Sequence, residues 1–236
     1  MNRENNMKKP LRLIDIFNLL DDRYGPRNWW PVTPPGKTYP EYTGGPENPE
    51  QIFEVAVGAV LTQNTSWKNA ARAVCNLNES GILNPEAIVK MDEKRLGRII
   101  RPSGYYNMKA KKLKVLAGYF IKNNNINRQS LLELYGIGPE TADSILLYAL
   151  NKPYFVVDAY TRRLFGRIGI IEGNGSYEAV RGYFETNLPD DSRLFNQFHA
   201  LIVEHAKSFC RKVPLCSDCP LRPYCRYPLT IEFDSD

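Results

Sequence analysis

The chain has 236 residues, of which 43% are hydrophobic and 24% are charged. This is ordinary usage for globular proteins and excludes a disordered chain, a collagen and a small disulfide-rich scaffold. No apolar run approaches the roughly 20 residues of a membrane helix, and Asp15 interrupts the apolar stretch after the basic N-terminus. We therefore expect a cytoplasmic protein with one large or two small domains and no secretory signal.

The net charge of +5 is a mild excess, but it is unevenly distributed. The stretch from Lys94 to Lys114 contains no acidic residue and eight basic ones: Lys94, Arg95, Arg98, Arg101, Lys109, Lys111, Lys112 and Lys114. A solvated helix face has this composition, and so does a phosphate-binding surface.

Apolar residues recur at helical spacing along most of the chain, which predicts an all-α fold of many short helices. The predicted helices cover residues 11–23, 50–63, 66–79, 85–90, 93–101, 107–123, 128–134, 139–150, 158–169, 176–186 and 192–207. Residues 24–49 hold seven prolines and four glycines, which predicts an irregular connection around the pair Trp29 and Trp30. The β-prone run 154–157 is too short to seed a sheet.

Two predicted helices meet through Gly136-Ile137-Gly138. The glycines permit positive φ and close approach of another backbone, Ile137 can tuck between the helices, and Pro139 suits the first helical position. The free N–H groups at such a helix start bind a phosphate oxygen without regard to base sequence. An ordinary helix–helix turn with a glycine cap is the alternative interpretation.

Asp158 follows the apolar run Tyr154-Phe-Val-Val and precedes an amphipathic helix. The simplest role for it is a helix N-cap. Capping also fixes the side chain, so a capping carboxylate that faces a groove can act on a bound nucleotide. We expect two other acids, Glu133 and Asp143, to lie at the surface.

Four of the five cysteines form the pattern Cys210-x5-Cys216-x2-Cys219-x5-Cys225. Structural zinc usually joins two short knuckles across a longer gap, and disulfides are disfavoured in the cytoplasm. Four thiolates in one compact loop suit a [4Fe–4S] cluster, with zinc as the alternative. The remaining Cys75 is expected to be buried and inert.

The hairpin Leu134-Tyr-Gly-Ile-Gly-Pro-Glu-Thr-Ala, followed by Val156-Val-Asp158, resembles the helix-hairpin-helix DNA glycosylase superfamily of the endonuclease III type, from about residue 50 to 226. The resemblance implies two helical domains with a DNA groove between them, residues 49–151 and residues 1–48 with 152–236. It also implies the C-terminal [4Fe–4S] loop at 210–225, although the first cysteine gap of the family is usually six residues and here is five.

The same resemblance implies roles for single residues. Asp158 is then catalytic, the hairpin residues Gly136, Gly138 and Thr141 hold DNA phosphates, and Gln63 fills the gap left by an extruded base. Tyr105 lies in the segment that wedges the opposite strand, and Lys109 belongs to the same DNA-binding segment. The expected partner is double-stranded DNA with a damaged base, bound by a monomer that associates with the nucleoid.

Glu140 occupies the position at which bifunctional members of the superfamily carry the lysine that forms a Schiff base. A glutamate cannot form the imine, so we expect a monofunctional glycosylase in which water attacks the sugar. Endonuclease III-like lyase activity through another lysine is the alternative.

Trp29, Trp30 and Phe53 resemble the aromatic base pocket of the 3-methyladenine glycosylase branch. An indole face attracts a cationic methylated adenine by stacking and cation–π interaction. The pair could equally plug a domain junction. Mismatched uracil or thymine, or adenine, are the alternative substrates, and a non-catalytic DNA-binding protein is the alternative of a different class.

Overall fold

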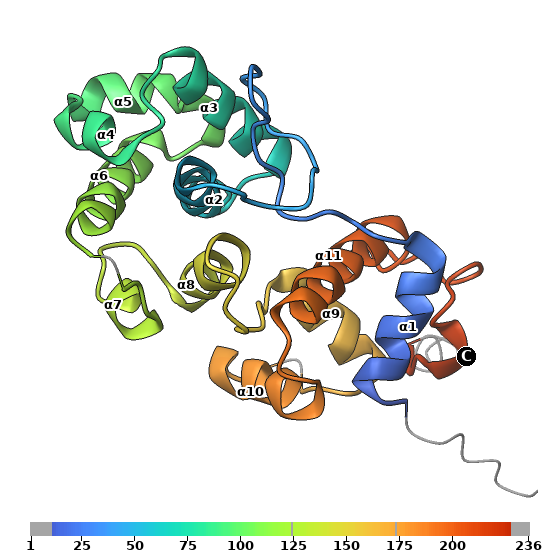
Figure 1. Cartoon of the computed structure of the whole chain (residues 1–236). Coiled ribbons are helices and arrows are strands. Elements are labelled where there is room, and N and C mark those ends of the chain that lie inside the picture. The colour runs from blue at the N-terminus through green and yellow to red at the C-terminus, as the bar shows by residue number, and fades with distance from the viewer. Residues whose placement is uncertain (1–10, 124, 173, 228–236) are drawn as a thin grey trace, which may run out of the picture. The chain divides into compact units, whose positions relative to one another are not determined.

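A computed structural model describes residues 11–123, 125–172 and 174–227, and these residues form short helices joined by turns (Figure 1). Within them no strand occurs, only an isolated antiparallel bridge between Val32 and Glu41. The helices are α1 (Leu13–Tyr24), α2 (Pro49–Leu61), α3 (Trp67–Glu79), α4 (Pro85–Lys90), α5 (Glu93–Ile99), α6 (Tyr106–Lys122), α7 (Arg128–Leu132), α8 (Pro139–Ser144), α9 (Ala159–Ile168), α10 (Tyr177–Asn187) and α11 (Ser192–Ser208). The predicted all-α class is confirmed, and the described helices include none long and apolar enough to cross a membrane.

Local sequence explains where these helices begin. Asn48, Asn84 and Asn127 each accept a hydrogen bond from a backbone N–H of the first turn of α2, α4 and α7. Proline follows directly at the first position of α2 and α4, where its missing N–H removes no helical bond. Two 3₁₀ turns, η1 (Arg101–Ser103) and η3 (Arg222–Tyr224), and the π-helix η2 (Ile145–Ala149) complete the elements.

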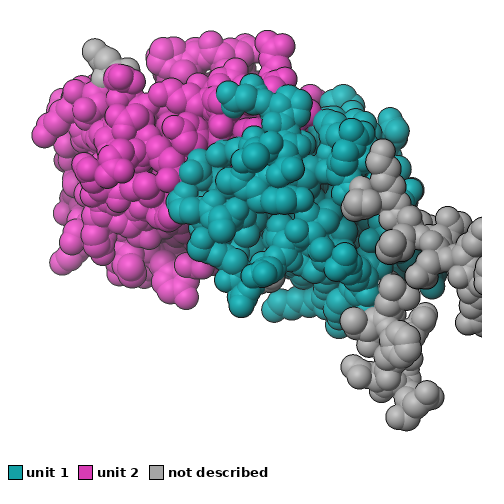
Figure 2. Space-filling view, turned by 90° about the horizontal axis from the view of Figure 1, so that it is seen from below, with its two compact units in different colours: residues 1–26, 157–190, 198–236 teal, residues 27–156, 191–197 magenta. Residues whose placement is uncertain are grey.

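The chain divides into two compact units, shown in teal and magenta in Figure 2. Unit 1 contains the described parts of Met1–Pro26, Val157–Asp190 and Phe198–Asp236, and unit 2 contains Arg27–Val156 and Asp191–Gln197. The domain division expected from the resemblance, 49–151 against 1–48 with 152–236, stays a prediction.

Unit 2 is built around α2, which is buried along nearly its whole length and packs against α3, α6, α8 and η2. In α6 the buried positions include Ala110, Leu113 and Leu116, and this helix also packs on α4 and α5. The core of unit 1 is aromatic. The ring of Phe165 in α9 lies edge-on to Phe184 of α10 at 4.8 Å and to Phe198 of α11 at 6.0 Å.

Candidate functional site

Asp158 is the N-cap of α9 in unit 1. Its Oδ1 accepts hydrogen bonds from the Thr161 backbone N–H at 2.7 Å and from the Thr161 hydroxyl at 3.0 Å. Its Oδ2 lies 3.5 Å from Nε2 of His199 in α11. The side chain of Asp158 is 14% exposed, so the carboxylate is mostly buried but not sealed off.

These contacts decide the charge of Asp158. Burial alone would raise the pKa of the carboxyl group, but the charge of His199 and the hydrogen bonds from Thr161 outweigh burial and lower this pKa below its ordinary value. Asp158 is therefore a fixed, ionised carboxylate near neutral pH. The N-cap role predicted from the sequence is confirmed, and the catalytic role stays a prediction.

The hairpin lies in unit 2 between α7 and α8. Gly136 has φ +78°, and an added Cβ there would overlap the side chain of Lys112. Gly138 differs from the expectation, because its φ of −93° is open to any residue and an added Cβ would meet nothing within 4 Å. Ile137 is buried as predicted. Only the first glycine is thus required by backbone conformation.

An ion pair fixes the two helices of the hairpin to each other. Arg128, the first residue of α7, donates to both carboxylate oxygens of Asp143 in α8, at 2.6 and 3.2 Å. The Asp143 side chain is fully buried, so its expected surface position is wrong, whereas Glu133 is exposed as expected. A buried carboxylate is tolerated here because a bidentate guanidinium pairs with it.

Gln63 lies in the turn after α2 and is held against the hairpin. Its Nε2 donates to the Gly136 carbonyl oxygen at 3.1 Å and to the Thr141 hydroxyl at 2.9 Å, while its Oε1 accepts from Lys112. Thr141 is buried by this arrangement. The structure therefore brings together Gln63, Gly136 and Thr141, three residues predicted to bind DNA.

Tyr105 precedes α6 with φ +44°, and 68% of its surface is exposed, as a wedging residue requires. Lys109 is different, because it is 2% exposed and its ammonium donates to two backbone carbonyl oxygens inside unit 2. The ammonium group of Lys109 therefore does not face a bound phosphate in this arrangement. If Lys109 contributes to DNA binding, as predicted, it does so indirectly.

The basic stretch from Lys94 to Lys114 also divides into two kinds of residue. Lys114 donates to the carbonyl oxygens of Val89 and Met91 at the end of α4, and Lys112 donates to Gln63. The exposed members are Lys94, Arg95, Arg98, Arg101 and Lys111. Five of the eight basic residues thus remain for a phosphate surface.

Trp29 and Trp30 belong to an aromatic cluster in unit 2. The centroid of the Trp30 indole lies 5.2 Å from the ring centroid of Trp67 and 4.9 Å from that of Tyr148. The Trp29 ring contacts Trp30 at 6.0 Å and Tyr148 at 6.1 Å. Trp30 is buried, whereas Trp29 is partly exposed. Of the pair, Trp29 therefore has surface left to meet a ligand.

Hydrogen bonds hold the segment that carries the two indoles. Buried Glu54 of α2 accepts from the backbone N–H and the hydroxyl of Thr33, each at 2.8 Å, and Asn196 donates to the Trp29 carbonyl oxygen at 2.9 Å. Burial raises the pKa of Glu54 to about 7, although the two Thr33 bonds oppose it. Phe53 is buried and lies edge-on to Phe120 at 5.3 Å, so its base-pocket role stays a prediction.

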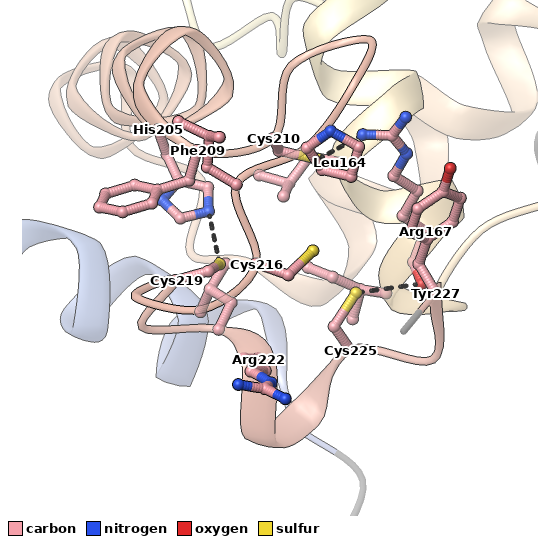
Figure 3. A pocket seen from close by; sticks show the side chains of 14 residues that line it. Leu164, Arg167, His205, Phe209, Cys210, Cys216, Cys219, Arg222, Cys225 and Tyr227 are labelled. Carbon is pink, nitrogen blue, oxygen red and sulfur yellow. Dashed lines mark hydrogen bonds between the residues drawn. The ribbon is translucent and has the colours of Figure 1, made fainter. Parts of the chain in front are cut away.

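The four clustered cysteines of unit 1 line one pocket between the end of α11 and the loop that follows it (Figure 3). This pocket encloses about 360 Å³ of space that no atom fills, counting the solvent at its mouth. In Figure 3 the sulfurs of Cys210, Cys216, Cys219 and Cys225 face this space. Among residues 11–123, 125–172 and 174–227, however, no three His, Cys, Asp or Glu side chains form a group that could hold a metal ion.

Several polar groups surround these sulfurs. Arg167 lies 3.4 Å from Sγ of Cys210, Arg163 donates to the Cys210 carbonyl oxygen at 2.7 Å, and His205 Nε2 lies 3.5 Å from Sγ of Cys219. Burial raises the pKa of the Cys219 and Cys225 thiols, and the charges of neighbouring cysteines add to the effect. The raised pKa values favour the neutral thiols of Cys219 and Cys225, so holding these two side chains as thiolates requires a nearby cation.

The chain is similar to known DNA repair proteins, which agrees with the hairpin and the carboxylate described above. Residues 57–190 match the HhH-GPD superfamily of base excision DNA repair proteins. A provisionally named DNA repair glycosylase of Methanocaldococcus jannaschii is 44% identical over 90% of this chain and 95% of its own length. Endonuclease III of Sulfolobus acidocaldarius is 30% identical over 75% of this chain and 83% of its own length.

The solved structure of the 3-methyladenine DNA glycosylase MagIII of H. pylori, bound to 1,N6-ethenoadenine, superposes with a TM-score of 0.67. It is 30% identical and covers 84% of this chain and 98% of its own. The chain belongs to the HhH-GPD superfamily of base excision DNA repair proteins, and within it to the endonuclease III-like DNA glycosylases.

Two residues of these clusters were not predicted: His199 beside Asp158, and Tyr148 beside the tryptophan pair. One signal was available for His199, because a histidine within the apolar stripe of residues 192–207 needs a polar partner. Nothing local marks Tyr148, since its position suits an ordinary helix core.

Proposed function

We propose that this protein is a monofunctional DNA glycosylase that removes an alkylated purine, with 3-methyladenine as the best candidate. The observation that carries the catalytic part is the state of Asp158. Its carboxylate is fixed by Thr161, kept ionised by its surroundings, and left partly exposed. An enzyme of this class must extrude the nucleotide and hold its base before the glycosidic bond breaks.

Breaking the bond between sugar and base leaves positive charge on the sugar. A preorganised carboxylate stabilises this charge without reorganising during the reaction. Oδ1 of Asp158 is used by Thr161, so Oδ2, beside His199, is the oxygen available to the sugar or to an attacking water.

Water is the proposed nucleophile because Glu140, an exposed residue of the first turn of α8, occupies the position of the imine-forming lysine. A carboxylate forms no Schiff base with the opened sugar. The product is then an intact abasic site. Lyase activity requires a different amine, and this is the alternative to be tested.

Two observations favour an alkylated purine. Trp29 offers a partly exposed indole supported by Trp30 and Tyr148, and the similar structure of MagIII contains an ethenoadenine. A cationic methylated adenine is electron-poor and already a good leaving group, so stacking on an indole suffices to hold it and no acid is needed. Mismatched uracil or thymine is the second candidate.

We further propose that Cys210, Cys216, Cys219 and Cys225 hold a [4Fe–4S] cluster. The donor set fits, because four soft thiolates line one pocket. When bound, the cluster would fix the loop after α11. We propose that the protein works as a monomer in the cytoplasm, on nucleoid DNA.

Duplexes that each carry one lesion test this proposal under single-turnover conditions. We expect strand breaks at 3-methyladenine only after alkali, and no covalent adduct with borohydride. A trapped adduct would contradict the monofunctional assignment. Preferred excision of mismatched uracil or thymine would contradict the substrate, and tight DNA binding without any excision would favour a non-catalytic protein.

A further inference from the structure

Two exposed turns of unit 2 share an unusual backbone conformation. Asn64, in the turn after α2, has φ +53°, and Tyr105, before α6, has φ +44°; Asn28 and Asn151, which are also exposed residues of unit 2, share this conformation. Both side chains are exposed. Asparagine tolerates this left-handed region, whereas a tyrosine stays there only when the surrounding structure enforces it, and such enforced residues cluster at functional sites.

A single buried cation connects these turns. Nζ of Lys109 donates to the carbonyl oxygen of Leu61 at 2.8 Å and to that of Ser103 at 2.7 Å. Leu61 lies three residues before Asn64, and Ser103 lies two residues before Tyr105. Asn64 and Tyr105, the tips of the two turns, are 41 positions apart in the chain. The ammonium group of Lys109 nevertheless binds a backbone carbonyl group just before each of them.

The chemistry of Lys109 argues against simple core filling. Burial lowers its pKa to about 8, helped by the nearby charge of Lys112, which shows that the fold disfavours this cation. A methionine would fill a similar volume without that penalty. What a methionine lacks is the ability to donate to two carbonyl groups at once.

We propose that Lys109 is a positioning residue that holds the Asn64 and Tyr105 turns at a fixed separation, so that both tips enter the DNA duplex together. This inference rests on the proposed function, since it assigns a task in extruding a nucleotide. It also explains how Lys109 can belong to a DNA-binding segment without touching a phosphate.

The first test uses the free protein and needs no DNA. Backbone N–H groups of Thr62 and Gln63 donate within the first turn, and those of Ser103 and Gly104 within the second. Lys109→Met should increase hydrogen exchange in both turns together. Lys122→Met, which removes an exposed lysine from the same helix, is the matched control and should change neither. Unchanged exchange in Lys109→Met, with the fold intact, would overturn the proposal.

The second test begins with variants that keep Lys109, so its first result does not depend on how Lys109 variants fold. The probe is a duplex with a tetrahydrofuran abasic-site analogue opposite 2-aminopurine, whose fluorescence reports unstacking separately from affinity. Asn64→Ala, Tyr105→Ala and the double variant form a cycle, and we expect the unstacking equilibrium to show coupling of about threefold or more. Lys109→Met should remove this coupling while Lys122→Met preserves it.

The outcomes separate this inference from the proposed function. If the wild type binds and unstacks this duplex but the two tip variants act independently, Lys109 does not couple the turns and the inference fails. If coupling is present yet no lesion is excised, the positioning role stands and the glycosylase proposal fails.

Discussion

Replacing Asp158 by asparagine separates the chemistry of this residue from its structural role. The substitution removes one negative charge and keeps the size of the side chain. Asparagine retains an Oδ1 that can accept the Thr161 N–H bond, now 2.7 Å long. Asp and Asn are about equally good N-caps, so α9 should remain intact.

The expected magnitudes differ between folding and catalysis. Asp158→Asn should change the free energy of unfolding by less than about 1 kcal/mol, whereas Asp158→Ala loses the cap and should cost about 0.5–2 kcal/mol. One preorganised electrostatic contact contributes about 100-fold or more to a rate, equivalent to about 2.7 kcal/mol of barrier. The asparagine variant should therefore be stable and nearly inactive.

The assay is single-turnover excision of 3-methyladenine, with affinity for the abasic-site duplex measured in parallel. Affinity should stay close to that of the wild type, and the alanine variant shows how much a lost cap contributes. Excision by Asp158→Asn within a few-fold of the wild-type rate would refute the reasoning, because the fixed charge would then be dispensable.

Three further predictions follow from other contacts. Because the folded-state pKa of Glu54 is about 7, above its ordinary 4.5, its stabilising contribution is complete below pH 4.5 and is lost as pH rises through 7. Denaturant melts between pH 4.5 and 7 should show the free energy of unfolding fall by up to about 3 kcal/mol. Glu54→Gln should reduce this dependence on pH, and an equal dependence in the wild type and the variant would exclude Glu54 as the cause. Trp29→Ala should weaken base stacking by about 1–3 kcal/mol in excision assays and Trp30→Ala should destabilise the fold by about 3–5 kcal/mol; the reverse pattern would exchange their roles. The purified protein should absorb near roughly 400 nm and contain iron, and Cys225→Ala should lose both, whereas zinc without iron would contradict the cluster.

The sequence predicts the helices well because each has its own apolar spacing and start signal. The range 85–90 agrees fully with α4, and 192–207 differs from α11 by one residue. The predicted helix 139–150 instead divides into α8 and the π-helix Ile145–Ala149. That change is a shift in backbone hydrogen bonding, which apolar spacing does not record.

The site is less predictable because single residues acquire their roles from distant parts of the chain. Asp158 was identified from its neighbours in sequence, but its charge state depends on His199, 41 positions away. Lys109 was placed among exposed cations because eight basic residues follow one another without an acid. Only the packed structure shows that its ammonium points inward, to Leu61 and Ser103.

Unit 1 is built from segments that lie far apart in the chain, and this determines when it can fold during synthesis. Helix α1 leaves the ribosome before the other helices of unit 1, but the Phe17 ring packs against Phe198, and Tyr24 hydrogen-bonds His205, 181 positions further along the chain. Since chains emerge N-terminus first, α1 cannot make these contacts until α11 has been made. Most of unit 2 can meanwhile form, because its residues 27–156 are continuous. Residues 27–156 of unit 2 can therefore fold before the contacts between α1 and α11 of unit 1 form.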